Sequence, residues 1–103
     1  MTENQSHVRK LLTVITESAL ESSLTRDLEK QGARGYTISD VRGKGDRGVR
    51  DAGWEASSNI RIDVVCEEAV GRRIAGYLKE RYYANFAMIV MMSDVEVLRP
   101  EKF

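Results

Sequence analysis

Apolar residues recur along this chain with two different spacings, and the order of the two constrains the fold. From Asn59 to Cys66, apolar side chains alternate with other residues, which is the period of a strand with one buried face. Leu20, Leu24 and Leu28 instead recur every four residues, which is typical of one face of an amphipathic helix. Segments of the two kinds follow one another, so we read the chain as a mixture of strands and helices.

The ends of the two expected helices carry recognisable signals. Gly32 follows the leucine stripe and is expected just beyond the end of the first helix, where glycine is common. Thr16 or Ser18 is expected to cap the start of that helix. Glu67 and Glu68 place negative charge at the start of the second helix, where the helix dipole favours it. Strands are expected at residues 7–16, 36–42, 59–66 and 87–93, with a further short strand at 95–98 and the second helix ending near residue 82.

The resulting order is strand, helix, strand, strand, helix, strand, in a single domain over residues 1–103 with residues 1–6 as a disordered tail. Two right-handed crossover units joined by a hairpin form the ferredoxin-like α+β fold, a four-stranded antiparallel sheet with two helices on one face. The other face then carries no helix. Since the first and fourth strands are apolar on both sides, we expect a homo-oligomer to cover that face.

A long connection over residues 43–58 separates the second and third strands. Residues 42–50 read Arg-Gly-Lys-Gly-Asp-Arg-Gly-Val-Arg, in which glycines are interleaved with cations. Hairpin connections usually have about two to five residues, and much longer ones are often functional or disordered. Glycine lets the backbone approach a ligand closely, backbone N–H groups bind anionic oxygens, and arginine forms paired hydrogen bonds with phosphate. The segment therefore predicts a loop that binds phosphate or another small oxyanion.

Composition limits the classes of function. The chain has 16 Lys+Arg and 16 Asp+Glu, and this neutrality argues against a nucleic-acid partner, because nucleic-acid binders usually carry a basic excess. A single cysteine, Cys66, excludes an internal disulfide, and with one histidine no metal site is expected.

No apolar run is long enough to span a bilayer and no signal peptide is visible, so we expect a cytoplasmic protein. The sequence shows no nucleophile–base arrangement and no Walker motif, so no catalytic residues are assigned.

Several short motifs, taken together, resemble those of PII signalling proteins. The chain reads Gly-Tyr-Thr at 35–37, Gly-x-Gly-x-Arg-x-Val-Arg at 43–50 and Ser-Asn-x-Arg at 58–61, and it ends in Val-Glu-Val-Leu-Arg at 95–99 with Lys-Phe at 102–103. The pattern is most similar to the PII-like branch that contains SbtB-type and carboxysome-associated proteins. The resemblance covers most of the chain.

The resemblance implies a non-catalytic regulatory protein. It implies a homotrimer that binds adenine nucleotides (ADP or AMP, with ATP or cyclic AMP as further candidates) in clefts between subunits, without a covalent cofactor. It also implies that residues 43–58, the T-loop of this family, become ordered when the ligand binds and control a protein partner such as a bicarbonate transporter or a carboxysome-linked protein. Bicarbonate is a further candidate ligand.

The resemblance also indicates which residues would hold the nucleotide. Arg47 and Arg50 are the candidates for phosphate contacts, although both are also interpretable as solvated loop charges paired with nearby aspartates. The hydroxyl of Thr37 is a candidate partner for an adenine edge, or Thr37 is an ordinary strand residue. The full set of candidate nucleotide- and anion-binding residues is Thr37, Gly43, Lys44, Gly45, Arg47, Arg50, Ala87 and Met88.

The chain departs from the classical PII pattern in two segments. Residues 43–58 contain no tyrosine, so the uridylylation known in that family is not expected here. Residues 82–87 contain neither glycine nor lysine where classical members have a Gly- and Lys-containing loop for Mg-ATP and 2-oxoglutarate. A small ferredoxin-like enzyme with weak nucleotide phosphohydrolase activity is an alternative. An RNA-binding domain is disfavoured, since the middle strands lack paired aromatic residues that would stack bases.

Overall fold

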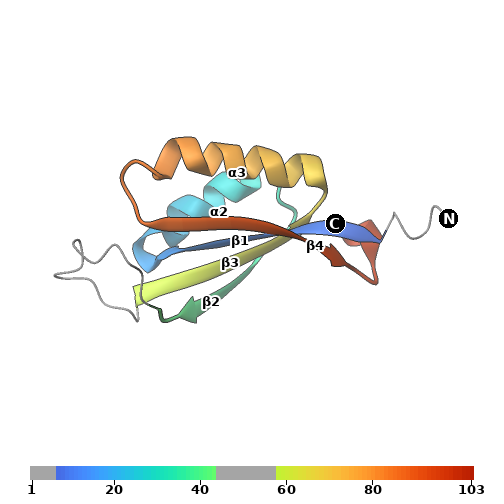
Figure 1. The fold of residues 1–103 in the computed structure, drawn as a ribbon, viewed down its shortest axis with the longest axis horizontal. Helices are drawn as coiled ribbons and strands as arrows, with labels where there is room; N and C mark the ends of the chain where they lie inside the picture. Colours follow the sequence, from blue (N-terminus) through green and yellow to red (C-terminus); the bar gives the residue numbers. More distant parts are fainter. Residues whose placement is uncertain (1–6, 44–57) are drawn as a thin grey trace.

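The computed structural model describes residues 7–43 and 58–103. Its helices lie together on one side of a single sheet (Figure 1). The elements in chain order are β1 (Val8–Glu17), the 3₁₀ turn η1 (Ser18–Leu20), α2 (Glu21–Lys30), β2 (Thr37–Val41), β3 (Asn59–Cys66), α3 (Glu68–Tyr82), β4 (Met88–Glu96) and the 3₁₀ turn η4 (Pro100–Lys102).

The sheet has the strand order β2-β3-β1-β4, and every pair is antiparallel. The long strand β1 lies in the middle and pairs with β3 on one side and β4 on the other, so that Thr16 is opposite both Ile60 and Met88. With α2 and α3 on one face, this is the ferredoxin-like α+β fold that the order of elements predicts (Figure 1). We call the face that carries no helix the open face.

The core lies between the helices and the sheet. The two apolar periods meet there: alternate residues of β1 and β3 are fully buried against the four-residue stripes of α2 and α3. Burial of these side chains is the main stabilising contribution to the fold, since a fully buried Leu or Ile contributes roughly 1.5–3 kcal/mol relative to an exposed one. The large side chains that are fully buried are Leu12, Val14, Leu24, Leu28, Ile60, Ile62, Val64, Ile74 and Leu78.

Gly32 ends α2 as predicted. It has a positive φ of 106°, its N–H donates to the carbonyl of Glu29, and the N–H of Ala33 donates to the carbonyl of Leu28. These two bonds satisfy carbonyl groups at the end of α2 that the helix itself leaves without partners. An L side chain at this φ is strained, so the position requires glycine.

The prediction for the start of the first helix was wrong. Neither Thr16 nor Ser18 caps it: β1 continues to Glu17, the turn η1 follows, and α2 begins only at Glu21 without a side-chain cap. The hydroxyl of Thr16 instead donates to the carbonyl of Ala87, 2.9 Å away, across the sheet. The strand pairing, rather than a local helix signal, determines the orientation of Thr16.

The expected separate strand at residues 95–98 is also absent from the described part of the chain. Residues 88–96 form one continuous strand, because β1 is long enough to pair with it as far as Val8 opposite Glu96. The N–H of Val97 then donates to the carbonyl of His7 and continues the contact by one more bond. The other predicted strands and helices are found within a few residues of their expected ends.

Candidate functional site

The open face has an apolar half over β1 and β4. Ile15 lies opposite Ile89 across the two strands, and Leu11 and Met91 share this face. Ile89 and Met91 remain about half exposed, at 54% and 48%, while Val90 between them packs against the core. This confirms that β1 and β4 are apolar on both sides. Large contiguous apolar surfaces are typical of interaction sites, so this half of the open face is a candidate for one.

The half of the open face over β3 and β2 is polar. Asp63 accepts a hydrogen bond from the hydroxyl of Thr13 at 2.7 Å and forms an ion pair with Nε of Arg61 at 3.0 Å. Thr37 on β2 is directly opposite Asp63, so its side chain belongs to the same face, and it is exposed. The candidate nucleotide contact Thr37 therefore lies beside an ordered carboxylate–arginine pair.

Several candidate binding residues meet at one end of the sheet. The end of β2 is paired with the start of β3, through Val41 opposite Asn59, and β4 begins at the same end, through Met88 opposite Thr16. Gly43 and Ala87 therefore lie at this end, where the connection from α3 to β4 is also seen (Figure 1). Lys44, Gly45, Arg47 and Arg50 lie outside the described residues, as does most of the 43–58 loop.

Ala87 and Met88 are less available to a ligand than the sequence indicates. The carbonyl of Ala87 already accepts the hydrogen bond from Thr16, and the side chain of Met88 packs against the core. We expect Ala87 and Met88 to contact a ligand through backbone groups rather than side chains, and this stays a prediction.

A cavity of about 240 Å³ lies at the opposite end of the sheet, and none of the candidate residues lines it. Its walls include Arg34 after α2, Val65 and Cys66 at the end of β3, and Phe103. Burial, with a smaller contribution from the neighbouring Glu67, raises the pKa of the Cys66 thiol, so the thiol is uncharged at neutral pH, while Glu67 itself also lines the cavity. The only sign of this cavity in the sequence is Arg34, which lies between two glycines just after the first helix. Sequence reasoning did not find the cavity.

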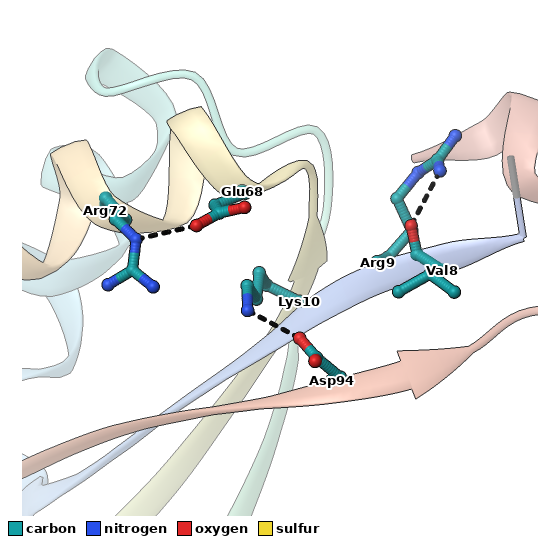
Figure 2. A network of polar contacts seen from close by, with 6 residues as sticks. All are labelled: Val8, Arg9, Lys10, Glu68, Arg72 and Asp94. Atoms are coloured by element: carbon teal, nitrogen blue, oxygen red, sulfur yellow. Dashed lines mark hydrogen bonds and ion pairs between the residues drawn. The ribbon is translucent and has the colours of Figure 1, made fainter. Parts of the chain in front are cut away.

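Paired charges surround the same end of the sheet. Lys10 forms an ion pair with Asp94 across β1 and β4 at 2.5 Å, and Arg72 pairs with Glu68 along α3 at 3.0 Å (Figure 2). Arg9 points the other way, and its guanidinium donates to the backbone carbonyls of Val8, Pro100 and Phe103. These bonds hold η4 against β1, next to the cavity that Phe103 lines.

Two absences complete the description of the site. Within residues 7–43 and 58–103, no three His, Cys, Asp or Glu side chains are grouped so that they could hold a metal ion. No helix in that part of the chain is both long and apolar enough to cross a membrane.

Fold and site together define a small ferredoxin-like domain with an open, half-apolar sheet face. A family model described as nitrogen regulatory protein P-II matches residues 9–102. The chain therefore belongs to the P-II family.

Solved structures agree with this assignment. A putative PII-like signalling protein from Thermus thermophilus is 40% identical, with a TM-score of 0.79, over 93% of this chain and 95% of that one. CPII from Thiomonas intermedia, in a structure bound to ADP and bicarbonate, is 27% identical, with a TM-score of 0.79, over 93% and 94% of the two chains. A second CPII structure, bound to ADP, AMP and acetate, matches at 25% identity and a TM-score of 0.80, over 94% and 95%.

Proposed function

We propose that this protein is a non-catalytic cytoplasmic regulator that senses adenine nucleotides, ADP or AMP above all, and bicarbonate. The observation that carries the proposal is the match of nearly the whole chain to CPII, whose structure contains ADP and bicarbonate. The cationic, glycine-rich segment at 43–50 supports it, since its chemistry suits both a phosphate group and a small planar anion. ATP and cyclic AMP remain further candidates for the same site.

The open face supports assembly into a homotrimer. Its apolar half over β1 and β4 leaves Ile89 and Met91 half exposed in the single chain. Burial of such residues against another copy would be favourable by roughly 25 cal/mol for each Å² of apolar surface removed from water. A chain of 103 residues also buries a smaller share of its surface than a large protein does, so assembly adds to its stability.

The placement of the two candidate regions supports a ligand site shared between copies. Gly43, Ala87 and Met88 are at one end of the sheet, while the cavity beside Arg34 is at the other. A single chain therefore cannot bring them together, but two neighbouring copies can. We place the phosphates near the end that carries the loop, and the base in the cavity of the next copy. There Val65, Val70 and Phe103 would contact the faces of a flat ring, while the guanidinium of Arg34 and the carboxylate of Glu67 would bond to its polar edges.

The regulatory output in this proposal is the T-loop. Contacts from Arg47 and Arg50 to the ligand would order residues 43–58, and the ordered loop would present a new surface to a partner in inorganic-carbon metabolism, such as a bicarbonate transporter. A ligand shifts such an equilibrium only by its differential affinity for the two states of the loop. Ligands that contact the loop are therefore the ones that switch it.

Isothermal titration of the full chain with ADP, AMP, ATP, cyclic AMP and bicarbonate tests the proposal. We expect ADP or AMP to bind, and Arg47→Ala to weaken binding roughly 10- to 100-fold, as for loss of a hydrogen bond to a charged group. Arg26→Ala, which removes an arginine on α2 away from the candidate residues, is the matched control and should bind like the unmodified protein. Absence of heat with every ligand would reject the proposal, and rapid phosphate release from ATP would favour the phosphohydrolase alternative.

A further inference from the structure

The connection from α3 to β4, residues 83–87, is held at both of its ends by side chains from other parts of the fold. Tyr82 lies just before it and Met88 just after it. The side chains that hold it come from α2 at one end and from β1 at the other. Neither feature was visible in the sequence.

At the α3 end, the anchor is the hydroxyl of Tyr82. It donates to the carboxylate of Asp27 at 2.5 Å and, since its single proton is used there, accepts from the hydroxyl of Ser23 at 2.5 Å. Tyr82 and Asp27 are only 3% and 5% exposed. Asp27 also pairs with Arg81 at 3.1 Å, and the guanidinium of Arg81 lies over the ring of Tyr82. The buried carboxylate of Asp27 therefore holds Tyr82 against α2, and the acceptor oxygens of this carboxylate have hydrogen-bond partners.

Tyr82 also shapes the chain that follows it. Its backbone carbonyl accepts hydrogen bonds from the N–H groups of Asn85 at 3.1 Å and Phe86 at 3.0 Å. Its ring lies 5.9 Å from the ring of Phe86, at an interplanar angle of 60°, a favourable tilted arrangement. The position of Tyr82 therefore determines the course of the turn.

At the β4 end, the anchor is the hydroxyl of Thr16. It donates to the carbonyl of Ala87 at 2.9 Å, and Thr16 is 3% exposed in the central strand of the sheet. Because Thr16 is also opposite Met88 in the pairing of β1 with β4, the end of the connection and the start of the strand share one attachment point.

We infer that Thr16 and Tyr82 are positioning residues for nucleotide binding: they hold residues 83–87 in the binding conformation before the ligand arrives, without touching it. This inference rests on the proposed function, in which the backbone at Ala87 and Met88 contacts a nucleotide. It adds two residues that belong to neither the candidate set nor the cavity.

The composition of the connection explains why its position matters. Residues 83–87 read Tyr-Ala-Asn-Phe-Ala and contain no cation. A lysine on a flexible stem can follow a phosphate, but a backbone N–H group must already be in place. A connection that is ordered in advance also avoids the loss of conformational entropy when the ligand binds. Holding the connection in place at both of its ends therefore takes the place of the lysine charge that residues 83–87 lack.

The test compares Thr16→Val and Tyr82→Phe with two matched variants of the full chain. Thr16→Ser keeps the hydroxyl, and Tyr77→Phe removes a longer bond of 3.4 Å to the same Asp27 from a residue outside the connection. Amide hydrogen exchange of residues 84–88, ADP titration and the thermal midpoint are measured for each. We expect Thr16→Val, which removes one hydrogen bond, and Tyr82→Phe, which removes two, to speed exchange in this segment and to weaken ADP binding roughly three- to tenfold. Thr16→Ser and Tyr77→Phe should stay within about twofold of the unmodified protein.

The outcomes separate the inference from the proposed function. If the unmodified protein binds no ADP, the proposed function fails, and the exchange rates still decide whether Thr16 and Tyr82 hold the connection. If ADP binds but both variants bind it as tightly as the unmodified protein, the inference is overturned. Equal losses of affinity in Tyr77→Phe, or losses that simply follow the thermal midpoint, would also overturn it.

Discussion

The two faces of the sheet use the same strands in different ways. On the helix-covered face, alternate residues of β1 and β3 are fully buried, and the described residues include no buried side-chain nitrogen or oxygen without a hydrogen-bond partner. On the open face, the sheet presents an apolar half and a polar half: Ile89 and Met91 are exposed on β4, and the ordered pair of Arg61 and Asp63 lies on β3 across β1. The covered face completes its packing within one chain. The open face has the composition of a surface that is completed by another molecule.

The largest expected effect is on assembly through the open face. Ile89→Glu should weaken self-association by about a hundredfold or more, since burial of an unpaired charge costs several kcal/mol. Sedimentation or light scattering across a concentration series measures this. Leu98→Glu is the matched control, because Leu98 is 91% exposed beyond the end of β4. Unchanged assembly in Ile89→Glu would show that this half of the open face is not the interface.

Two neighbouring valines compare the faces within one strand. Val64 is fully buried on the helix-covered face, and Val65 is half-buried on the open face. Val64→Ala should lower the free energy of unfolding by about 2 kcal/mol or more, because it removes buried methyl groups and leaves a cavity. Val65→Ala should cost less than about 1 kcal/mol when unfolding is measured on dissociated subunits. If denaturant titration gave equal losses of unfolding free energy for Val64→Ala and Val65→Ala, the division into two faces would be contradicted.

Two glycines of α3 test how tightly the helix packs on the covered face. A Cβ at Gly71 would lie 3.1 Å from Sδ of Met92 and 3.3 Å from Sγ of Cys66, whereas a Cβ at Gly76 would have no neighbour within 4 Å. Gly76→Ala should stabilise the protein by about 0.5–1 kcal/mol through helix propensity. In Gly71→Ala, the close contacts of the new methyl group with the two sulfur atoms should cancel this gain in stability. Thermal unfolding of the pair measures the difference, and equal gains would show that the sulfur atoms move aside freely.

The smallest effect concerns the buried thiol of the covered face. Because burial raises the pKa of Cys66 in the folded protein, the unfolded chain loses its thiol proton first as the pH rises. The protonated thiol of Cys66 therefore contributes fully to the free energy of unfolding below the ordinary thiol pKa of about 8.5. This contribution is lost as the pH rises through the higher pKa of the thiol in the folded protein. The free energy of unfolding, measured from about pH 7 to about pH 10, should fall more steeply for the unmodified protein than for Cys66→Ala. Parallel curves would refute this.

The fold was largely predictable because its signals are local. The alternation in β3, the leucine stripe of α2 and the glycine after it each depend on residues close in sequence, and the structure confirms all three. The errors were at contacts between distant residues. Thr16 carries the same hydroxyl whether it caps a helix or bonds to Ala87, which is 71 residues away, and only the pairing of β1 with β4 decides between the two.

The candidate site was only partly predictable for the same reason. Thr37, Gly43, Ala87 and Met88 came from motifs that resemble a family, and the structure places the last three at one end of the sheet. The cavity beside Arg34 combines segments that the sequence keeps far apart, and an arginine between two glycines is its only local sign.

The sequence by itself determined the alternation of strands and helices, the covered and open faces, and membership of the P-II family, because periodicity and motif are properties of neighbouring residues. Only the tertiary structure decided where Thr16 donates its hydrogen bond, how Asp27 ties Tyr82 to α2, and which end of the sheet holds a cavity. These features depend on the directions and distances between side chains from different elements, which exist only once the helices have packed on the sheet.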